Sequence, residues 1–316
     1  MTKTPVLIDQ RLHANYRQLA LIQRRFSRLK LPKGQRVLNL LSGANLSRKR
    51  GKGLDFEEYR HYLAGDDIRG LDWRVTLRTG QPHVRMYSEQ KERPLVLIVD
   101  LRQSMYFASV EVMKSVVAAE VSAFLIGASQ SDCERVSALI VTDDELLWMK
   151  PTRTKGRLSN ILRSLEKVSM ALNTPAQLPR QRKNSLTSAL KLISGFQFKG
   201  ALIAIISDFH DCAKCTYQEF NHISRANRLV FCRVQDEAEY QSQLEGTIQV
   251  TDGTDQASIG ANDNLALQAL NEFRLDQRSN LHRYSKALDT PLFSLDTSGK
   301  HIEQMMSQLS RPTYVK

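Results

Sequence analysis

The sequence has 316 residues, 41% of them hydrophobic, so it can bury a substantial core as one large domain or two modest ones. No segment approaches the roughly 18 consecutive apolar residues of a membrane span, and the first residues lack the features of a signal peptide. Four scattered cysteines are too few for a secreted disulfide scaffold. We therefore expect a cytoplasmic protein, with peripheral association at the inner face of the membrane as the alternative that its net charge of +12 suggests.

The positive charge is concentrated at the start of the chain. Residues 1–53 contain 13 lysines and arginines against one acid, Asp9, which accounts for the whole excess. The spacing predicts a basic amphipathic helix and a linker over residues 1–50. The apolar positions are Leu12, Tyr16, Leu19, Ile22, Phe26 and Leu29, and the basic ones are Arg11, Arg17, Arg24, Arg25, Arg28 and Lys30. Such a helix could cover the protein's own core, or bind an acidic protein, an anionic membrane surface or, least favoured, nucleic acid.

Residues 51–93 predict a small β-rich subdomain with dense charges of both signs. Short strand-like pieces at residues 72–78 and 83–88 flank the turn TGQP. One interpretation is a solvated face whose ion pairs contribute little energy. The other is a recognition surface in which arginines and a tryptophan are the anchors. That surface would consist of Arg60, Asp66, Asp67, Arg69, Asp72, Trp73 and Arg74.

From residue 94 onward, nearly continuous apolar runs alternate with stretches of helical spacing. The runs at 95–100, 136–144, 201–208, 229–234 and 292–296 are typical of buried parallel strands. An excursion with a polar helix interrupts the rhythm at about 235–287. The pattern predicts an α/β domain with a doubly wound, mostly parallel sheet over residues 94–316. Ligands of such sheets bind at the carboxyl ends of the strands, where Asp100 and Asp208 lie.

Two segments resemble a known family. The run GKGLDFEEYRHYLAGDDIRGLDWRVTLRTGQPHVR, followed by PLVLIVDLRQSM, is similar to the signature of the domain of unknown function 58 family. The resemblance extends from about Gly51 to Leu309. Members of that family join such a segment to a von Willebrand factor A-like domain and are typically encoded beside MoxR-type AAA+ ATPases. The resemblance therefore implies a von Willebrand factor A-like fold and a role as an adaptor or chaperone partner of such an ATPase.

The von Willebrand factor A-like fold often carries a metal-ion-dependent adhesion site. Its pattern is Asp-x-Ser-x-Ser after the first strand, a threonine from a second loop and an aspartate from a third. Mg²⁺ suits such oxygen ligands and keeps an open position for a partner's carboxylate. The resemblance places Asp100, Ser104 and Asp208 in matching positions, with Thr187 or, less favoured, Ser185 as the second-loop hydroxyl.

Arg102 stands where the first serine of that pattern would be. A guanidinium has five donors and no lone pair, so it cannot coordinate a cation. If Arg102 turns into the site, it could pair with Asp100 and Asp208, replace the charge of the metal and still receive a partner's carboxylate. If it points to solvent, the site is vestigial. A Mg²⁺ site that lacks one hydroxyl is the third alternative.

Enzymatic and zinc-binding interpretations are disfavoured. The segment SDFHDCAKC places His210, Cys212 and Cys215 beside Asp208, but a structural zinc site needs four ligands and no second pair follows. The sequence contains no nucleophile elbow, phosphate-binding glycine loop or dinucleotide fingerprint. We predict a non-enzymatic adaptor without a cofactor that works with a MoxR-type ATPase. The alternative is a scaffold that binds an anionic membrane or nucleic acid through residues 1–53.

Overall fold

The computed structural model describes residues 9–27, 55–63, 67–88, 94–129, 135–172, 184–212, 214–239, 247–251, 256–260 and 264–310. The chain divides into two compact units. The larger is formed by Met1–Gly43 and Arg93–Lys316, and the smaller by Ala44–Glu92. Among the described helices, none combines the length and the apolar composition needed to cross a bilayer.

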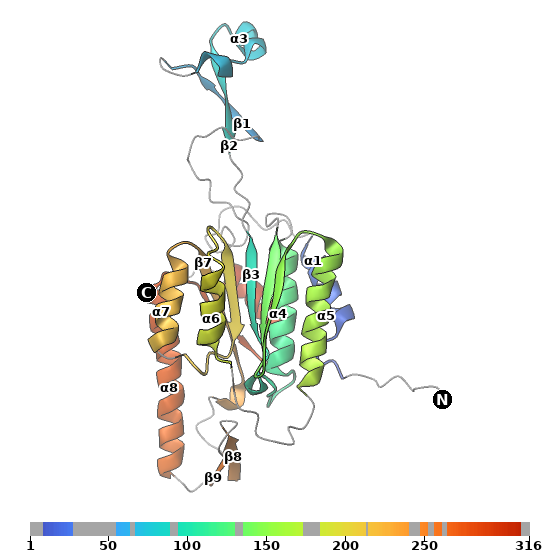
Figure 1. Ribbon diagram of the computed structural model, residues 1–316, viewed down its shortest axis with the longest axis vertical. Coiled ribbons are helices and arrows are strands. Elements are labelled where there is room, and N and C mark those ends of the chain that lie inside the picture. Colours follow the sequence, from blue (N-terminus) through green and yellow to red (C-terminus); the bar gives the residue numbers. More distant parts are fainter. Residues whose placement is uncertain are drawn as a thin grey trace, which may run out of the picture. The chain divides into compact units, whose positions relative to one another are not determined.

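The larger unit is built on a six-stranded sheet in the order β10-β7-β6-β3-β4-β5 (Figure 1). The strands are β3 (Leu95–Asp100), β4 (Val136–Val141), β5 (Leu146–Thr152), β6 (Leu202–Ser207), β7 (Arg228–Gln235) and β10 (Leu292–Asp296). All pair in parallel except β5, which is antiparallel to β4. The predicted α/β class with a mostly parallel sheet is confirmed.

Strand β5 has no counterpart in the sequence-based prediction. Its residues are mostly half-buried and include Lys150 and Pro151, so it lacks the continuous apolar run of a central strand. Residues 142–144, predicted as the end of a strand, instead form the turn between β4 and β5, where the Thr142 amide donates to the Glu145 carbonyl at 3.1 Å. Leu147 and Met149 pack against the core on one face of the sheet, and Leu146 and Trp148 pack against the core on the other, so β5 is an edge strand that is half-buried on both faces.

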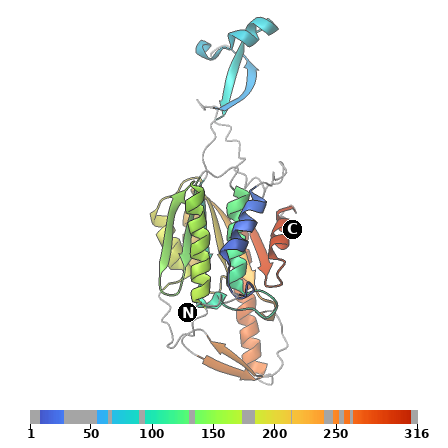
Figure 2. The same cartoon turned by 90° about the vertical axis from the view of Figure 1, so that its right-hand side faces the viewer.

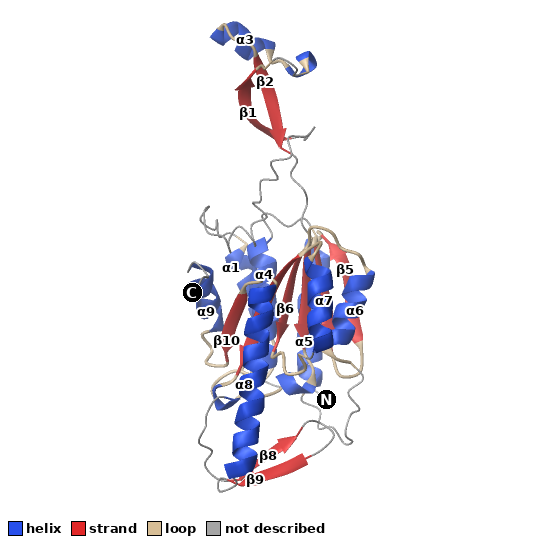
Figure 3. Cartoon of the chain, turned by 90° about the vertical axis from the view of Figure 1, so that its left-hand side faces the viewer, coloured by secondary structure: helices blue, strands red, loops and turns tan. Residues whose placement is uncertain are grey.

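Helices cover both faces of the sheet (Figures 1 and 3). One face is covered by α1 (Tyr16–Phe26), α4 (Lys114–Ser129), α5 (Lys155–Ala171) and α9 (His301–Ser310), and the other by α6 (Leu186–Gly195), α7 (Lys214–Ser224) and the end of α8 (Asn264–Ala287). Successive residues of a strand point to opposite faces. Val99 of β3 accordingly packs in the hydrophobic core on the α4 side of the sheet, and Ile98 packs in the core on the α6 side.

Helix α1 lies against α4, so the predicted basic helix uses its apolar side inside the protein (Figure 2). Its buried residues are Leu19, Ile22 and Phe26. The two helices approach closely at Gly127, where an added Cβ would lie 2.4 Å from the Gln23 carbonyl oxygen. Together with the sheet, α5 and α9, helix α1 leaves every residue of α4 except Glu120 buried. Arg11 and Leu12 precede the helix, Arg17, Arg24 and Arg25 are exposed on it, and Arg28, Leu29 and Lys30 lie outside the described residues.

The excursion at 235–287 contains an antiparallel pair, β8 (Thr247–Thr251) and β9 (Gln256–Gly260), followed by α8 (Figure 3). Leu281 and Tyr284 near the end of α8 are buried in the hydrophobic core on the α6 side of the sheet. The Tyr284 ring also lies 4.9 Å from that of Tyr217 on α7. The last turns of the polar helix therefore complete one layer of the larger unit.

The smaller unit contains the antiparallel strands β1 (Asp55–His61) and β2 (His83–Ser88), a short 3-10 turn at Ile68–Gly70 and the helix α3 (Trp73–Thr79). The predicted strand at 83–88 is present, but the prediction of a strand at 72–78 is wrong, because these residues form the cap and most of α3. Asp72 caps this helix by accepting from the amides of Arg74 and Val75, and Gly80 ends it with φ 74°. These two cap residues outweigh the strand propensity of the residues between them.

Candidate binding site at the strand ends

The site lies where the order of strands changes direction. From β3 the chain proceeds to β4 on one side of the sheet and later to β6 and β7 on the other, so the switch point lies between β3 and β6. Charged side chains from the end of β3, the loops after β3 and β6, the start of α4 and the segment after β7 come together here. We call this group the strand-end site, and its members are Asp100, Arg102, Lys114, Asp208, His210, Asp211 and Glu239.

Arg102 turns into the site and away from solvent. Its side chain is 7% exposed and grips the fully buried Asp100, with Nε donating to Oδ1 at 2.9 Å and Nη2 to Oδ2 at 2.6 Å. Ser207 at the end of β6 donates a further hydrogen bond to Oδ2 of Asp100 at 2.7 Å. The loop is held by Asp143, which accepts from the Gln103 amide at 2.7 Å. Both oxygens of Asp100 are thus occupied by donors.

The other side of the Arg102 guanidinium is occupied by Asp211. Nη1 donates to Oδ2 of Asp211 at 2.6 Å, and Nη2 donates to Oδ1 at 3.1 Å. Oδ2 also accepts from the Leu186 amide at the start of α6 at 2.9 Å, an arrangement that the helix dipole favours. Burial lowers the pKa of Arg102, but Asp100 and Asp211 outweigh it and raise the pKa above the ordinary value. Asp211 was missed in the sequence, although it lies only three positions after Asp208.

Asp208 was expected beside Arg102, but it forms its ion pair with Lys114 instead. Lys114 is 1% exposed, and its Nζ lies 3.2 Å from Oδ2 of Asp208. The reason is the alternation of side chains: Ser207 points to the α6 face together with Asp100, so Asp208 points to the α4 face, where Lys114 begins α4. The two aspartates that end β3 and β6 therefore serve two different cations.

Glu239 and His210 complete the group around Lys114. Nζ of Lys114 lies 2.6 Å from Oε1 of Glu239, and Nε2 of His210 lies 3.4 Å from that oxygen and 3.8 Å from Oδ2 of Asp208. Burial raises the pKa of both carboxyls, but His210 and Lys114 outweigh it, lowering the pKa of Asp208 well below its usual range and that of Glu239 to about 2. Asp208 in turn raises the pKa of His210. No sequence signal linked Lys114 or Glu239 to this site.

The predicted metal ligands are not arranged as a Mg²⁺ site. The Thr187 hydroxyl lies 2.7 Å from that of Thr216 on α7, and Ser185 caps α6 by accepting from the Ser188 amide. Ser104 is half-buried in a short 3-10 turn. In the part of the chain that the structure describes, no group of three or more His, Cys, Asp or Glu side chains could hold a metal ion. With both Asp100 oxygens engaged by donors, the residues present do not fit this metal.

Cys212 is poorly suited to zinc or redox chemistry. It is 3% exposed, and burial followed by the charge of Asp211 raises the pKa of its thiol far above the neutral range. A thiol that stays protonated is neither a nucleophile nor a good zinc ligand. The side chain of Cys215 lies outside the described residues, so the Cys-x-x-Cys pair is not described as a whole.

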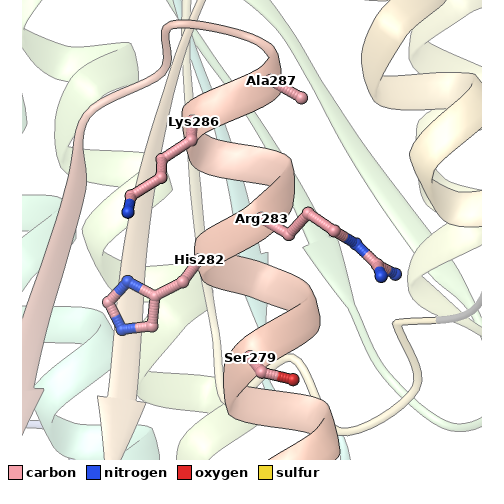
Figure 4. Close-up of a pocket in the computed structure, with 5 residues that line it drawn as sticks. All are labelled: Ser279, His282, Arg283, Lys286 and Ala287. Atoms are coloured by element: carbon pink, nitrogen blue, oxygen red, sulfur yellow. The ribbon is translucent and has the colours of Figure 1, made fainter.

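A separate hollow of about 580 Å³ lies on α8, lined by Ser279, His282, Arg283, Lys286 and Ala287 (Figure 4). Burial and then the nearby cations Arg233, Arg278 and Lys286 lower the pKa of His282, so the surroundings are positively charged. The hollow is lined by one helix and contains none of the strand-end residues. It does not contribute to the candidate site.

The predicted surface of the smaller unit is split between structural and exposed residues. Asp72 is 4% exposed and is engaged by Arg85, whose Nη2 lies 2.6 Å from Oδ2, and by the Tyr59 hydroxyl at 3.1 Å. Asp72 therefore holds the unit together and is not a contact residue. Asp67 caps the 3-10 turn, Arg60 is half-buried, Arg69, Trp73 and Arg74 are exposed, and Asp66 lies outside the described residues.

Comparisons with known proteins match the larger part of the chain. The family described as "Protein of unknown function DUF58" matches residues 58–276. The uncharacterized proteins Rv1480 of Mycobacterium tuberculosis and Mb1516 of Mycobacterium bovis are each 28% identical over 181 residues, covering 57% of this chain and 55% of theirs. The chain thus spans about half the length of the curated relatives it matches. The crystal structure of conserved hypothetical protein BatB from Bacteroides thetaiotaomicron aligns with a TM-score of 0.40 at 11% identity, covering 69% of this chain and 98% of that chain.

Proposed function

The chain belongs to the DUF58 family, and we propose that it is a cytoplasmic, non-enzymatic adaptor with a von Willebrand factor A-like fold that works with a MoxR-type AAA+ ATPase. The observation that supports this most is Arg102, which is buried between two carboxylates at the switch point of the sheet. It supplies a fixed positive charge where the adhesion pattern would have a metal. A carboxylate of the partner is a natural ligand for such a guanidinium.

The partner's carboxylate would have to replace Asp211. Four hydrogen bonds from the Arg102 side chain already reach Asp100 and Asp211. Asp211 is the accessible one, because its side chain is 30% exposed whereas that of Asp100 is fully buried. Exchange keeps the number of carboxylates around Arg102 constant, but simple addition of a third would introduce like-charge repulsion. The strand-end site thus acts as a receptor whose own carboxylate is displaced by the partner.

Affinity capture of the tagged protein from its native lysate, with quantitative mass spectrometry, tests the proposal. We expect recovery of an AAA+ ATPase, with a larger yield from Asp211→Asn, which weakens the competing pair but keeps an acceptor for the Leu186 amide. Arg102→Met should lose the ATPase. Asp276→Asn makes the same substitution as Asp211→Asn at an exposed site on α8 and should change nothing. Absence of the ATPase, or equal loss in the Asp211 and Arg102 variants, would contradict the exchange.

The alternative of a scaffold on an anionic membrane or nucleic acid depends on the exposed arginines of α1. Leu19, Ile22 and Phe26 of that helix are buried, so the side available to such a surface carries the arginines and the exposed Leu21. Deleting the helix would uncover α4, so charge reversal of Arg17, Arg24 and Arg25 is the better test. On our proposal the reversal leaves ATPase capture intact. Loss of capture together with loss of binding to anionic vesicles would favour the scaffold.

A further inference from the structure

Helix α3 of the smaller unit exposes apolar side chains that its own fold does not bury. Trp73 is 63% exposed and Leu77 is 84% exposed. They are four positions apart and therefore lie on one side of the helix. The opposite side faces inward, because Thr76 is half-buried and its hydroxyl accepts from the His83 amide of β2 at 3.2 Å. The orientation of the apolar pair is thus set by the packing of α3 on the strands.

Arginines border this pair. Arg74 and Arg78 are also four positions apart, and both are exposed. The nearest carboxylate along the chain, Asp72, is buried and is held by Arg85 and by the amides that it caps. The exposed side of α3 therefore combines an apolar pair with a basic pair. We call Trp73, Arg74, Leu77 and Arg78 the α3 face.

The α3 face is preorganised. Asp72 fixes the first turn of the helix, Gly80 ends it in the left-handed conformation, and the Arg85 pair fastens the cap to β2. A surface that is already ordered loses little conformational entropy on binding. Tryptophan and arginine are also the residue types that most often dominate the energy of protein interfaces.

We propose that the α3 face is a docking surface for an acidic amphipathic helix of a protein partner. Apolar side chains of that helix would cover Trp73 and Leu77, and its carboxylates would pair with Arg74 and Arg78. A second copy of this chain fits less well, because the net charge of +12 makes two copies repel each other. A bilayer also fits less well, since two apolar side chains on a helix of seven residues provide little area for insertion.

Fluorescence of Trp73 in the whole protein tests this proposal. The chain has two tryptophans, and Trp148→Phe leaves Trp73 as the single reporter while keeping an aromatic ring against Phe196, which lies 4.6 Å away. The probe is a synthetic helical peptide of about four turns with leucines along one side and glutamates along the other. Control peptides replace the glutamates with lysines or the leucines with serines.

We expect only the peptide with both features to shift the Trp73 emission to shorter wavelength. Its affinity should fall at least about tenfold in Leu77→Ala and in the double variant Arg74→Glu, Arg78→Glu. Leu275→Ala makes the same change at a leucine that is 62% exposed on α8 and should bind normally.

Four outcomes would overturn the proposal. A shift caused by phosphatidylserine vesicles and not by the peptide would assign the face to a membrane. A shift that appears on raising the protein concentration would assign it to a second copy. An emission that is already at short wavelength in the free protein would mean that its own chain covers Trp73. Equal binding of all three peptides would remove the role of charge and apolar contact alike.

Discussion

Replacing Lys114 with methionine removes a buried charge while keeping a side chain of similar length. The Lys114 side chain is 1% exposed, and its Nζ lies 2.6 Å from Oε1 of Glu239 and 3.2 Å from Oδ2 of Asp208. Removing one partner of a buried ion pair typically costs about 3–5 kcal/mol, because the remaining charge is uncompensated. For a unit of this size, about 2–4 °C of Tm per kcal/mol gives an expected fall of about 10 °C.

The loss of stability in Lys114→Met should also depend on pH. In the native protein the pKa values of Asp208 and Glu239 are lowered, against the effect of burial, by His210 and Lys114. Carboxyls with lowered pKa values stabilise the fold above their unfolded pKa of about 4 and lose that contribution as the pH falls through the folded value. Without Lys114, burial is opposed mainly by His210, so the folded pKa values rise. The difference between native protein and variant should therefore be largest near neutral pH and shrink below about pH 4.

Urea unfolding in a Trp73→Phe background measures this effect, because Trp148 on β5 then reports on the larger unit alone. Lys150→Met is the matched control: Lys150 is exposed on β5, and its loss should change the free energy of unfolding by no more than about 0.5 kcal/mol. A loss below about 1 kcal/mol at Lys114, or one that stays constant from neutral to acid pH, would refute the assignment of the ammonium as a buried counter-charge.

Three further results are expected. In urea unfolding, Gly127→Ala should destabilise the protein by about 1–3 kcal/mol, because the added Cβ would lie 2.4 Å from the Gln23 carbonyl oxygen. At the control position Gly156 on α5 an added Cβ meets nothing within 4 Å, so Gly156→Ala should be neutral or stabilising by up to about 1 kcal/mol. Millimolar Mg²⁺ should leave Tm unchanged because the Asp100 oxygens are occupied, and a rise that depends on the metal would contradict this. Cys212 should resist alkylation until the protein unfolds, because burial raises the pKa of its thiol; early modification in peptide mapping would show otherwise.

The central strands were predictable because burial on both faces requires continuous apolar runs, as in Leu95–Asp100 and Leu202–Ser207. The elements that the prediction missed are half-buried at the edge of the sheet or are specified by the residues at their ends. Strand β5 is mostly half-buried and includes the exposed Lys150, and α3 is specified by Asp72 and Gly80 at its ends, not by the residues between them. Propensity alone favoured a strand there, since tryptophan, valine and threonine are common in sheets.

The site was predictable in part. The sequence placed Asp100 and Arg102 in the site because they lie at the end of a predicted strand. They are two positions apart, which allows the Arg102 amide to donate to Oδ1 of Asp100. The predicted pairing of Arg102 with Asp208 was wrong because consecutive residues at the end of β6 point to opposite faces of the sheet. Ile206 is buried on the α4 side, so Ser207 points to the α6 side and Asp208 to the α4 side. Lys114 and Glu239 were out of reach, since Lys114 lies 94 residues from Asp208 and 125 from Glu239, and only the folded chain brings them together.

The two faces of the sheet give the two cations different roles. Around Lys114 the partners are sealed, with Asp208 fully buried and Glu239 14% exposed, so separating them would leave charges without water. Around Arg102 one partner, Asp211, is 30% exposed and already partly hydrated, so its release costs less. The same edge thus contains one ion pair suited to holding the fold and another suited to exchange with a ligand. On this argument, substitutions at Lys114 act on stability and substitutions at Asp211 act on binding, even though both groups lie at the ends of neighbouring strands.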